Sequence, residues 1–364
     1  MTTDASDEHF VPGRLCLFGE HSDWAAGYRS AHPEIARGVC VVAGTERGVR
    51  VRATPAEGSL IVSSRVAGQA QCEPWQIPWR EAELVAAAGS DHFLRYVAGA
   101  AAEFEARCSG RGATLSFTSN LPAQKGLSSS AAVCVATLRG LAEIAGRSLS
   151  REEEMEWAYL GERRTGSACG RLDPIVAYGR VVSRVDFDGD DVAIGFPEVA
   201  TPVPLVVVDL GRSKDTPRIL ADLHRCYPDA PDPQARAVRE ALGAANQATV
   251  AGALRALAAG DLETLGKLMT EAQARFDRDV VPASTALEAP HQQRVLAHPA
   301  LAELGFGAKG VGSQGDGCVQ VVARDAETQA TLVARLGDER GLSAFAMTVP
   351  ATDRRPHPAP DESA

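Results

Sequence analysis

The sequence predicts a protein of two domains that mixes helices and strands, and three observations support this. The chain has 364 residues, too many for one typical domain and a comfortable length for two. Short segments rich in β-branched residues and longer segments with helical spacing occur along the whole chain. No internal repeat is found. The class is therefore α/β or α+β.

We expect residues 1–9 to form a flexible leader and residues 10–200 to form the first domain. Its strands are short, rich in β-branched residues and bounded by Gly or turn residues. Its helices show helical apolar spacing, and the one at residue 150 begins with a Ser N-cap and acidic residues. The expected strands are 14–19, 38–45, 48–54, 59–64 and 113–122, and the expected helices are 91–107, 128–146 and 150–168.

The second domain is expected over residues 201–351 and starts with the apolar strand VPLVVVDLG. Two further strands should lie in GCVQVVAR and at the end of the domain in LSAFAMTVPA. Residues 352–364 are rich in Pro and polar residues, which predicts a disordered tail. The expected helices are 234–259, 261–277, 287–303 and 326–337.

Composition excludes several classes of function. Asp plus Glu is 47 and Lys plus Arg is 37, so the net charge is −10, which argues against nucleic acid as a partner. The eight cysteines form no C-x-x-C pair, which is typical of free thiols in a reducing cytoplasm. The acidic start MTTDASDEHF is no signal peptide, and no apolar run reaches the ~18 residues of a membrane span. A cytoplasmic protein without a membrane partner is expected.

The stretch LPAQKGLSSSAAVCVATL places a glycine and three serines at the start of a predicted helix. Gly126 allows a tight turn, and the free N–H groups and dipole of the helix start attract an anion such as phosphate. The Ser hydroxyls could bond a phosphate oxygen or Mg²⁺. The alternative is a plain Ser-capped helix. A Walker A loop is excluded, because Lys125 precedes the glycine.

The stretch GAKGVGSQGDGCVQVV matches the spacing of a dinucleotide fingerprint through Gly310, Gly312 and Gly315. That interpretation fails, because the fingerprint needs a following helix and CVQVVA predicts a strand. The glycines instead indicate close approach of backbone to a ligand or to another loop, and the alternative is a flexible hairpin loop.

Two carboxylates, Glu162 and Asp173, stand eleven residues apart in YLGERRTGSACGRLDPIVAYG. Such a pair could divide its work, one group holding a metal and the other acting as a base. A single acidic residue is more often a solvated surface charge. The apolar neighbours of Asp173 predict partial burial, which requires a partner for the charge.

In the segment PGRLCLFGEHSDW, a predicted strand is followed by three ionisable residues. Glu20, His21 and Asp23 offer hydrogen-bond acceptors and donors suited to the hydroxyls of a polyol, and Arg14 supplies a permanent positive charge. The alternative is a polar turn whose carboxylates face water.

In this order PGRLCLFGEHSD, LPAQKGLSSSAA and GVGSQGDGC resemble the three signature motifs of the GHMP kinases, which include galactokinase, homoserine kinase and mevalonate kinase. The resemblance covers most of residues 11–350. It implies an α+β fold of two domains, the first like ribosomal protein S5 domain 2 and the second ferredoxin-like, with the active site in the cleft between them. It also implies ATP-dependent phosphoryl transfer to a hydroxyl, with ATP and Mg²⁺ as cofactors. A monomer or homodimer is expected.

The resemblance also implies roles for residues. Asp173, in Gly170-Arg-Leu-Asp173, would be the catalytic base or orient the hydroxyl, and Arg14 would lower the pKa of the hydroxyl. Ser130, or its neighbour Ser129, would hold Mg²⁺ with Glu162. Glu20, His21 and Asp23 match substrate-binding positions of galactokinase-like members. The expected ATP-binding residues are Lys125, Gly126, Leu127, Ser128, Ser129, Ser130 and Ala131, and those near the phosphates or cleft are Gly310, Gly312, Ser313 and Gly315.

The motifs depart from the family pattern in places. Ser313, Gln314 and Asp316 interrupt the glycines of the third motif, and Asp316 near phosphate would be repulsive unless it points away. Trp24 and Tyr28 differ from the residues of the usual galactokinase motif. The leading hypothesis is a sugar kinase, galactokinase-like and acting on the anomeric hydroxyl, because of Arg14 and the His-x-Asp pair. The alternatives are a mevalonate- or amino-alcohol-type kinase, and a catalytically inactive regulator that binds sugar or nucleotide.

Overall fold

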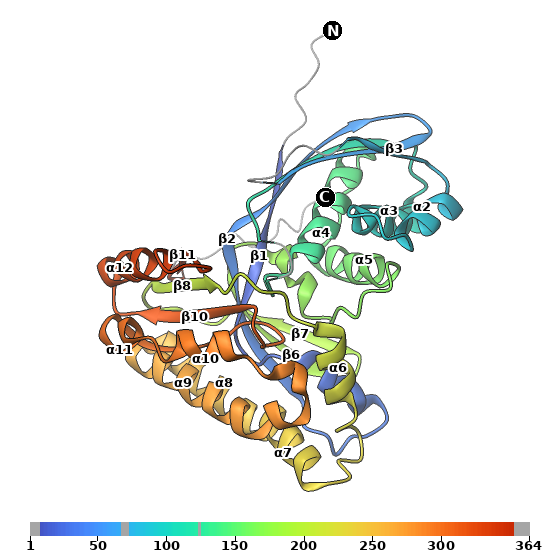
Figure 1. Ribbon diagram of the computed structural model, residues 1–364. Helices are drawn as coiled ribbons and strands as arrows, with labels where there is room; N and C mark the ends of the chain where they lie inside the picture. Colours follow the sequence, from blue (N-terminus) through green and yellow to red (C-terminus); the bar gives the residue numbers. More distant parts are fainter. Residues whose placement is uncertain (1–7, 67–72, 123–124, 353–364) are drawn as a thin grey trace.

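The computed structural model describes residues 8–66, 73–122 and 125–352, and these form two packed parts, each with its own sheet (Figure 1). The first sheet has seven strands in the order β4-β3-β5-β2-β6-β7, and β1 pairs with β2 beside this path. Its strands are β1 (His9–Phe18), β2 (Gly38–Pro55), β3 (Ser59–Val66), β4 (Trp75–Pro78), β5 (Ala113–Ser119), β6 (Val182–Asp188) and β7 (Asp191–Gly195).

Helices cover one side of the first sheet. Helix α4 packs on β1, β2 and β5, and helices α3 and α5 pack beside it. The Ala-rich faces of α3 and α4 allow this close packing. The fully buried alanines are Ala98, Ala100, Ala101 and Ala102 of α3 and Ala131, Ala132 and Ala136 of α4. The helical segments of this part are α1 (Ser22–Gly27), η1 (Tyr28–Ser30), α2 (Glu81–Ala88), α3 (Arg95–Cys108), α4 (Ser129–Ile144), α5 (Arg151–Arg163) and η2 (Asp173–Tyr178).

The second sheet has four antiparallel strands in the order β11-β8-β10-β9. Numbered within this domain, the order is 4-1-3-2, which confirms the ferredoxin-like topology that the resemblance implied. Buried valines of β8 and β10 form its centre. The strands are β8 (Val203–Asp209), β9 (Gly305–Gly310), β10 (Cys318–Ala323) and β11 (Ser343–Val349).

The helices of the second part lie against this sheet and against the first part (Figure 1). Helix α9 packs on β9, and helix α8 also contacts β1 and β2. Because β2 contacts elements of both parts, the two sheets share a continuous apolar core. The helical segments are α6 (Thr216–His224), α7 (Pro233–Leu242), α8 (Ala244–Ala259), α9 (Leu262–Asp279), η3 (Val281–Ala283), η4 (Thr285–Leu287), α10 (Pro290–Leu296), α11 (Pro299–Leu304) and α12 (Ala326–Gly337).

Several expected boundaries were wrong. The strands expected at 38–45 and 48–54 are one strand, β2, within which Gly48 faces the Phe10 ring. The helix expected at 234–259 is broken at Gly243, and the helix expected at 287–303 is two short helices separated before Pro299. The short elements α2, β4, β6 and β7 were not expected.

Both ends differ in part from expectation. His9 belongs to β1, and Glu8 pairs with Arg50 and Arg52, so these two residues are not part of a leader. Residues 1–7 lie outside the described residues. At the other end, the Thr352 backbone N–H donates to the Val199 carbonyl, and residues 353–364 of the expected tail lie outside the described residues.

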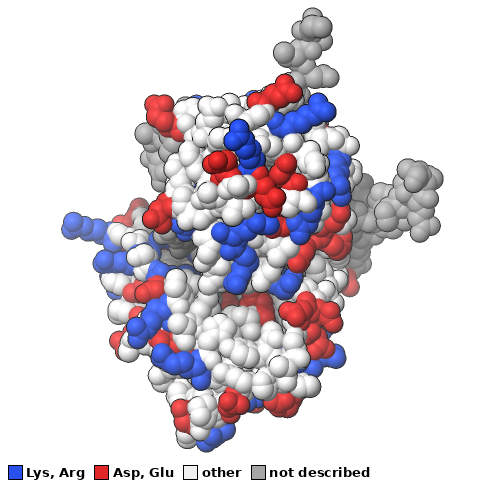
Figure 2. Space-filling view, turned by 90° about the vertical axis from the view of Figure 1, so that its right-hand side faces the viewer, with Lys and Arg blue, Asp and Glu red and all other residues white. Residues whose placement is uncertain are grey.

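No helix within the described ranges is both long enough and apolar enough to cross a membrane. Figure 2 shows Lys and Arg interspersed with Asp and Glu over one face, which is hollowed near its middle with acidic atoms in the hollow. Among the residues that the structure describes, no group of three or more His, Cys, Asp and Glu side chains is placed to hold a metal ion.

Candidate active site

The first motif places Arg14 at a bulge of β1. The pairing of β1 with β2 shifts register between Pro12 and Arg14. A Cβ on Gly13 would lie 2.8 Å from the Leu127 carbonyl oxygen, so glycine lets the second motif approach the strand. The Arg14 backbone N–H donates to Leu127 O at 3.0 Å, and its Nη1 donates to Gly126 O at 3.0 Å. Strand β1 therefore holds the Ser-rich loop in place.

Asp173 accepts two hydrogen bonds at one carboxylate oxygen. Arg14 Nη2 lies 2.5 Å from Asp173 Oδ1, and Ser128 Oγ donates to the same oxygen at 2.6 Å. Burial opposes the charge of Arg14, but Asp173, Cys16 and Asp23 together outweigh it, so the pKa of Arg14 is raised. These contacts join residues separated by 159 positions in the chain. The structure thus brings the two expected catalytic residues together.

The start of α4 keeps its backbone donors free. Ser128 is the N-cap and has a φ of 55°, the left-handed region that a serine rarely adopts. Its hydroxyl donates to Asp173 and does not cap the helix. The first N–H groups of α4 therefore have no side-chain acceptor, which is the arrangement that binds anions at helix starts. Leu127 and Ala131 are buried, and Ser129 and Ser130 are partly exposed.

Glu162 meets Ser130 at the same end of α4. Helix α5 presents Glu162 because Gly161 packs against Gly99 and Ala100 of α3, where a Cβ would lie 2.8 Å from Ala100 Cα. Ser130 Oγ donates to Glu162 Oε1 at 2.7 Å. Ser167 Oγ also donates to Oε1, at 3.2 Å.

The second oxygen of Glu162, Oε2, is buried and has no hydrogen-bond partner. Burial, and then the nearby charge of Asp173, raise the pKa of Glu162 to about 7. A buried carboxylate with a free oxygen beside the Ser130 hydroxyl fits Mg²⁺, which is commonly bound by one or two protein carboxylates plus substrate phosphates. The residues present therefore fit the cation that the family resemblance implied.

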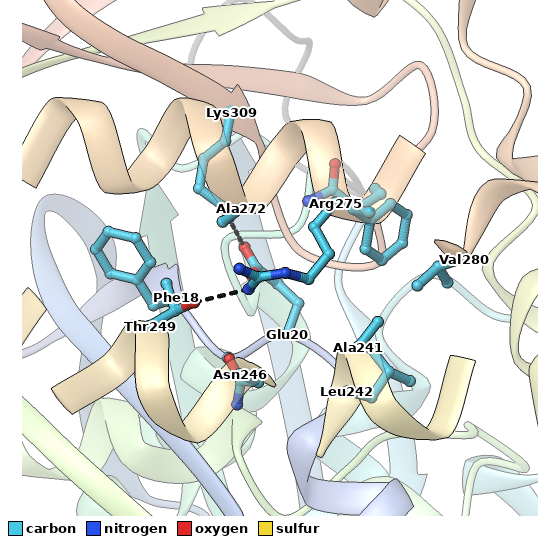
Figure 3. Close-up of a pocket in the computed structure, with 13 residues that line it drawn as sticks. Phe18, Glu20, Ala241, Leu242, Asn246, Thr249, Ala272, Arg275, Val280 and Lys309 are labelled. Atoms are coloured by element: carbon cyan, nitrogen blue, oxygen red, sulfur yellow. Dashed lines mark hydrogen bonds and ion pairs between the residues drawn. The ribbon is translucent and has the colours of Figure 1, made fainter. Parts of the chain in front are cut away.

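The expected substrate residue Glu20 is already paired. Its Oε1 forms an ion pair with Lys309 Nζ, and both side chains are buried. Lys309 comes from β9, so the pair joins the two parts of the molecule. Figure 3 shows Glu20 pointing at Lys309, beside a small cavity of ≈ 40 Å³ that residues of α7, α8 and α9 line. Sequence reasoning missed Lys309, although a lone lysine in the buried run GFGAKG signalled a charge that needs a partner.

His21 is held by aromatic neighbours. Its Nδ1 accepts a hydrogen bond of 3.0 Å from Trp24 Nε1, and its ring stacks on Phe276 at 6.0 Å between centroids. Its Nε2 is buried and has no hydrogen-bond partner among the described residues. Burial, with the charge of Lys214, lowers the pKa of His21 to about 3, so the ring is neutral.

Asp23 lies against the segment that ends at Asp173. Its Oδ2 accepts a hydrogen bond from the Leu172 N–H at 3.4 Å, and a Cβ on Gly170 would lie 1.6 Å from that oxygen. Burial and then the charge of Asp173 raise the pKa of Asp23. Gly170 is therefore required by the close approach of Asp23, and the carboxylate lies near the proposed reaction centre.

Trp24 and Tyr28 join the first motif to helix α6. The Trp24 ring lies 4.4 Å from the His224 ring and 5.3 Å from the Tyr227 ring. Tyr28 stacks on Tyr227 at 5.3 Å, and its hydroxyl lies 2.8 Å from His224 Nδ1. The two aromatic residues that the family pattern left unexplained thus pack the two parts of the molecule together.

The third motif faces the second one. A Cβ on Gly312 would lie 3.1 Å from Gly126 Cα. Ser313 Oγ lies 3.1 Å from Thr216 Oγ1, at the start of α6, and Gly315 lies beside Lys214. Gly310 ends β9 and is buried, where a Cβ would meet the amide oxygens of Gln292 and Gln314.

Asp316 points to helix α10 and not to the Ser-rich loop. Its Oδ1 accepts a hydrogen bond of 2.9 Å from the Gln292 N–H, in the first turn of that helix. The helix start stabilises the negative charge there. The repulsion between Asp316 and phosphate that the sequence suggested is therefore avoided.

Lys125, expected at the phosphates, bonds to the second part of the molecule. Its Nζ lies 2.7 Å from Asp209 Oδ1 and donates to Arg212 O at 2.9 Å. Both partners stand at the end of β8 and in the loop that follows it. Arg218 pairs with Asp222 within α6.

Part of the chain matches a known protein family. Residues 95–180, which include α4, Glu162 and Asp173, match the family model "GHMP kinases N terminal domain". This match confirms the resemblance to the GHMP kinase superfamily that the motifs indicated. Among curated relatives of this superfamily, the mevalonate kinase of Thermococcus gammatolerans is 27% identical over 229 residues, or 62% of this chain and 64% of that protein. The chain thus matches less than two thirds of the length of this GHMP kinase.

Solved structures of GHMP kinases share the fold over nearly the whole chain. The structure of L. major mevalonate kinase in complex with R-mevalonate has a TM-score of 0.70 at 19% identity, covering 95% of this chain and 97% of that one. Lactococcus lactis galactokinase complexed with galactose has a TM-score of 0.73 at 17% identity, covering 96% and 95%. At this identity the likeness establishes the α+β fold of two domains.

Proposed function

We propose that this chain transfers the γ-phosphoryl group of ATP to a hydroxyl of a small molecule. The observation that carries the proposal is the contact of Arg14 and Ser128 with Asp173 at the start of α4, beside Glu162 and Ser130. Phosphoryl transfer requires little covalent chemistry from the protein, but it requires positioning and positive charge around the phosphates. This corner of the molecule supplies both.

Each residue then has a physical role. The free N–H groups at the start of α4 would bind the phosphates, and Glu162 with Ser130 would hold Mg²⁺. Mg²⁺, when bound, neutralises charge on the phosphates. Asp173 would accept or orient the proton of the acceptor hydroxyl, and Arg14 keeps that carboxylate charged and close. The complete set of these groups argues against the inactive regulator.

For the acceptor, we propose a hydroxy compound of the mevalonate or amino-alcohol type. Mevalonate kinases are the curated relatives found by sequence, which supports this alternative over the sugar that the motifs favoured. The structure adds a reason, because the Glu20 carboxylate is paired with Lys309 and the Nδ1 of His21 accepts from Trp24. Two of the three groups expected to bind sugar hydroxyls are therefore already engaged.

A sugar is the second candidate acceptor. It is favoured by Asp23, whose carboxylate lies beside the segment of Asp173 and remains able to accept from a hydroxyl. The fold of a galactokinase complexed with galactose also matches nearly the whole chain.

A coupled ADP-release assay tests the proposal with mevalonate, homoserine and a panel of monosaccharides, each with and without Mg²⁺. We expect Mg²⁺-dependent ADP release with mevalonate or homoserine, and a product heavier by one phosphoryl group in mass spectrometry. Turnover of a monosaccharide, without turnover of mevalonate or homoserine, would favour the sugar kinase hypothesis. If the protein binds ATP but none of the tested compounds stimulates ADP release, the inactive regulator is favoured instead.

A further inference from the structure

Lys214 enters the candidate site from the second part of the molecule. It lies in the loop between β8 and α6, and its Nζ donates to the Val311 carbonyl at 3.1 Å. Val311 lies between Gly310 and Gly312 of the third motif. The side chain is partly buried, although the residues on either side of it, Ser213 and Asp215, are exposed. The loop therefore directs this one side chain inward.

Glycines of both Gly-containing motifs make room for the Lys214 side chain. A Cβ on Gly126 would lie 3.3 Å from Lys214 Nζ, and a Cβ on Gly312 would lie 3.2 Å from the same atom. A Cβ on Gly317 would lie 3.2 Å from Lys214 Cδ. Each of these distances is tighter than an ordinary carbon contact. The ammonium thus lies between the two loops, close to a glycine of each.

The charge of Lys214 lacks a carboxylate partner among the described residues, and this separates it from the other three lysines of the chain. Lys125 pairs with Asp209, Lys267 with Glu263 and Lys309 with Glu20. An ammonium has three N–H donors, and the structure gives Lys214 one acceptor, a neutral carbonyl.

Burial lowers the pKa of Lys214 to about 8, and the nearby charge of Arg14 also lowers it. A desolvated ammonium with free donors gains most from an anion. The loop that ends at Gly126 and the free N–H groups of α4 stand beside it, and these groups also favour an anion.

We propose that Lys214 binds the β- or γ-phosphate of the nucleotide, between Gly126 of the second motif and Gly312 of the third. The inference depends on the proposed kinase function and deepens it, because it adds a binding residue from the second part of the molecule. ATP would then contact both parts at once, through the start of α4 and through Lys214. The sequence directed attention to Lys125, whose ammonium already has a carboxylate partner.

Nucleotide binding measured by calorimetry tests this inference without relying on turnover. The variant Lys214→Met removes the charge and keeps most of the side-chain volume. We expect it to weaken ATP binding in the presence of Mg²⁺ by about 10- to 100-fold, the range for a lost charge-assisted hydrogen bond. AMP, which lacks the β- and γ-phosphates, should bind the variant and the wild type alike.

Matched variants keep the test decisive. Lys267→Met removes a lysine of an exposed ion pair on α9 and should bind ATP like the wild type. If Lys214→Met does not fold, as judged by its thermal unfolding, Lys214→Gln replaces it. A twofold or smaller change in the ATP dissociation constant of the Lys214 variants overturns the inference. Failure of the wild type to bind ATP overturns the proposed function together with this inference.

Discussion

The two sides of the candidate site differ in how their polar groups are satisfied. On the phosphoryl side, Glu162 Oε2 is buried without a partner, and the start of α4 leaves its N–H groups uncapped. On the acceptor side, Glu20 is paired with Lys309 and the His21 Nδ1 accepts from Trp24. The first side can therefore receive charged groups. The second side is largely closed by contacts within the protein, and its buried unpartnered atom, His21 Nε2, belongs to a neutral ring.

This difference explains why the reaction is easier to propose than the acceptor. Unsatisfied buried groups are costly, so their presence at Glu162 points to a specific missing partner, a cation. Groups that are already paired within the protein, such as Glu20, do not indicate a missing ligand. Where Glu20 and Lys309 neutralise each other, neither the sign nor the shape of the acceptor can be inferred from charge.

The largest effect should come from removing the charge at the centre of the phosphoryl side. We expect Asp173→Asn to lower acceptor-dependent kcat by about 10²- to 10⁴-fold, the usual contribution of a positioned acid or base. ATP binding should change little, because the phosphates are proposed to contact the start of α4 and not Asp173. The check is ADP release together with calorimetric binding of ATP.

The surface variant Asp338→Asn is the matched control for this change, since Asp338 is exposed after α12. Each variant is assayed below its own unfolding temperature, because Arg14 loses its carboxylate partner in Asp173→Asn. A kcat within tenfold of the wild type would show that Asp173 does not act on the reacting hydroxyl.

The second effect concerns the closed acceptor side. Lys309→Met leaves the buried Glu20 carboxylate without its partner and should lower the free energy of unfolding by about 3–5 kcal/mol. Adding Glu20→Gln removes the stranded charge and should recover part of this loss. Urea unfolding of the two single variants and the double variant measures the coupling.

Lys267→Met again serves as the control, because its exposed pair with Glu263 should leave stability unchanged within error. If Lys309→Met unfolds like Lys267→Met, the acceptor side is not held by this ion pair. The contrast between an open phosphoryl side and a closed acceptor side would then be wrong.

Much of the fold and part of the site could be predicted from the sequence, because local patterns determine them. The helix α12 starts and ends where its spacing predicted, and the start of α4 follows from Gly126 and three serines. The pairing of Arg14 with Asp173 could be expected only through the family resemblance, since 159 positions separate them.

Other features could not be predicted, because they depend on contacts between distant segments. The sequence gives no sign that Lys309 reaches Glu20 or that Tyr28 reaches His224, and both contacts arise when the second part packs on the first. The same packing gives Lys125 a carboxylate partner, Asp209, and leaves Lys214 without one among the described residues.

The smallest effect should appear in the pH dependence of stability. The pKa of His21 is lowered to about 3 in the folded chain by burial, against about 6.5 when unfolded. Between these values the unfolded chain binds the extra proton, so stability from the neutral ring is complete above pH 6.5 and is lost as pH falls. Each pH unit below 6.5 should cost up to about 1.4 kcal/mol.

The comparison that isolates this contribution is His21→Gln, which cannot gain the proton. Carboxylates shift stability in both proteins over the same range, so the informative quantity is the extra loss of the wild type between pH 7.5 and pH 5.5, measured by urea unfolding. His32→Gln, at a half-exposed histidine near Glu34, should behave like the wild type. Equal losses in the wild type and His21→Gln would mean that the ring takes up a proton in the folded state. The acceptor side would then be open to water, contrary to the contrast drawn with the phosphoryl side.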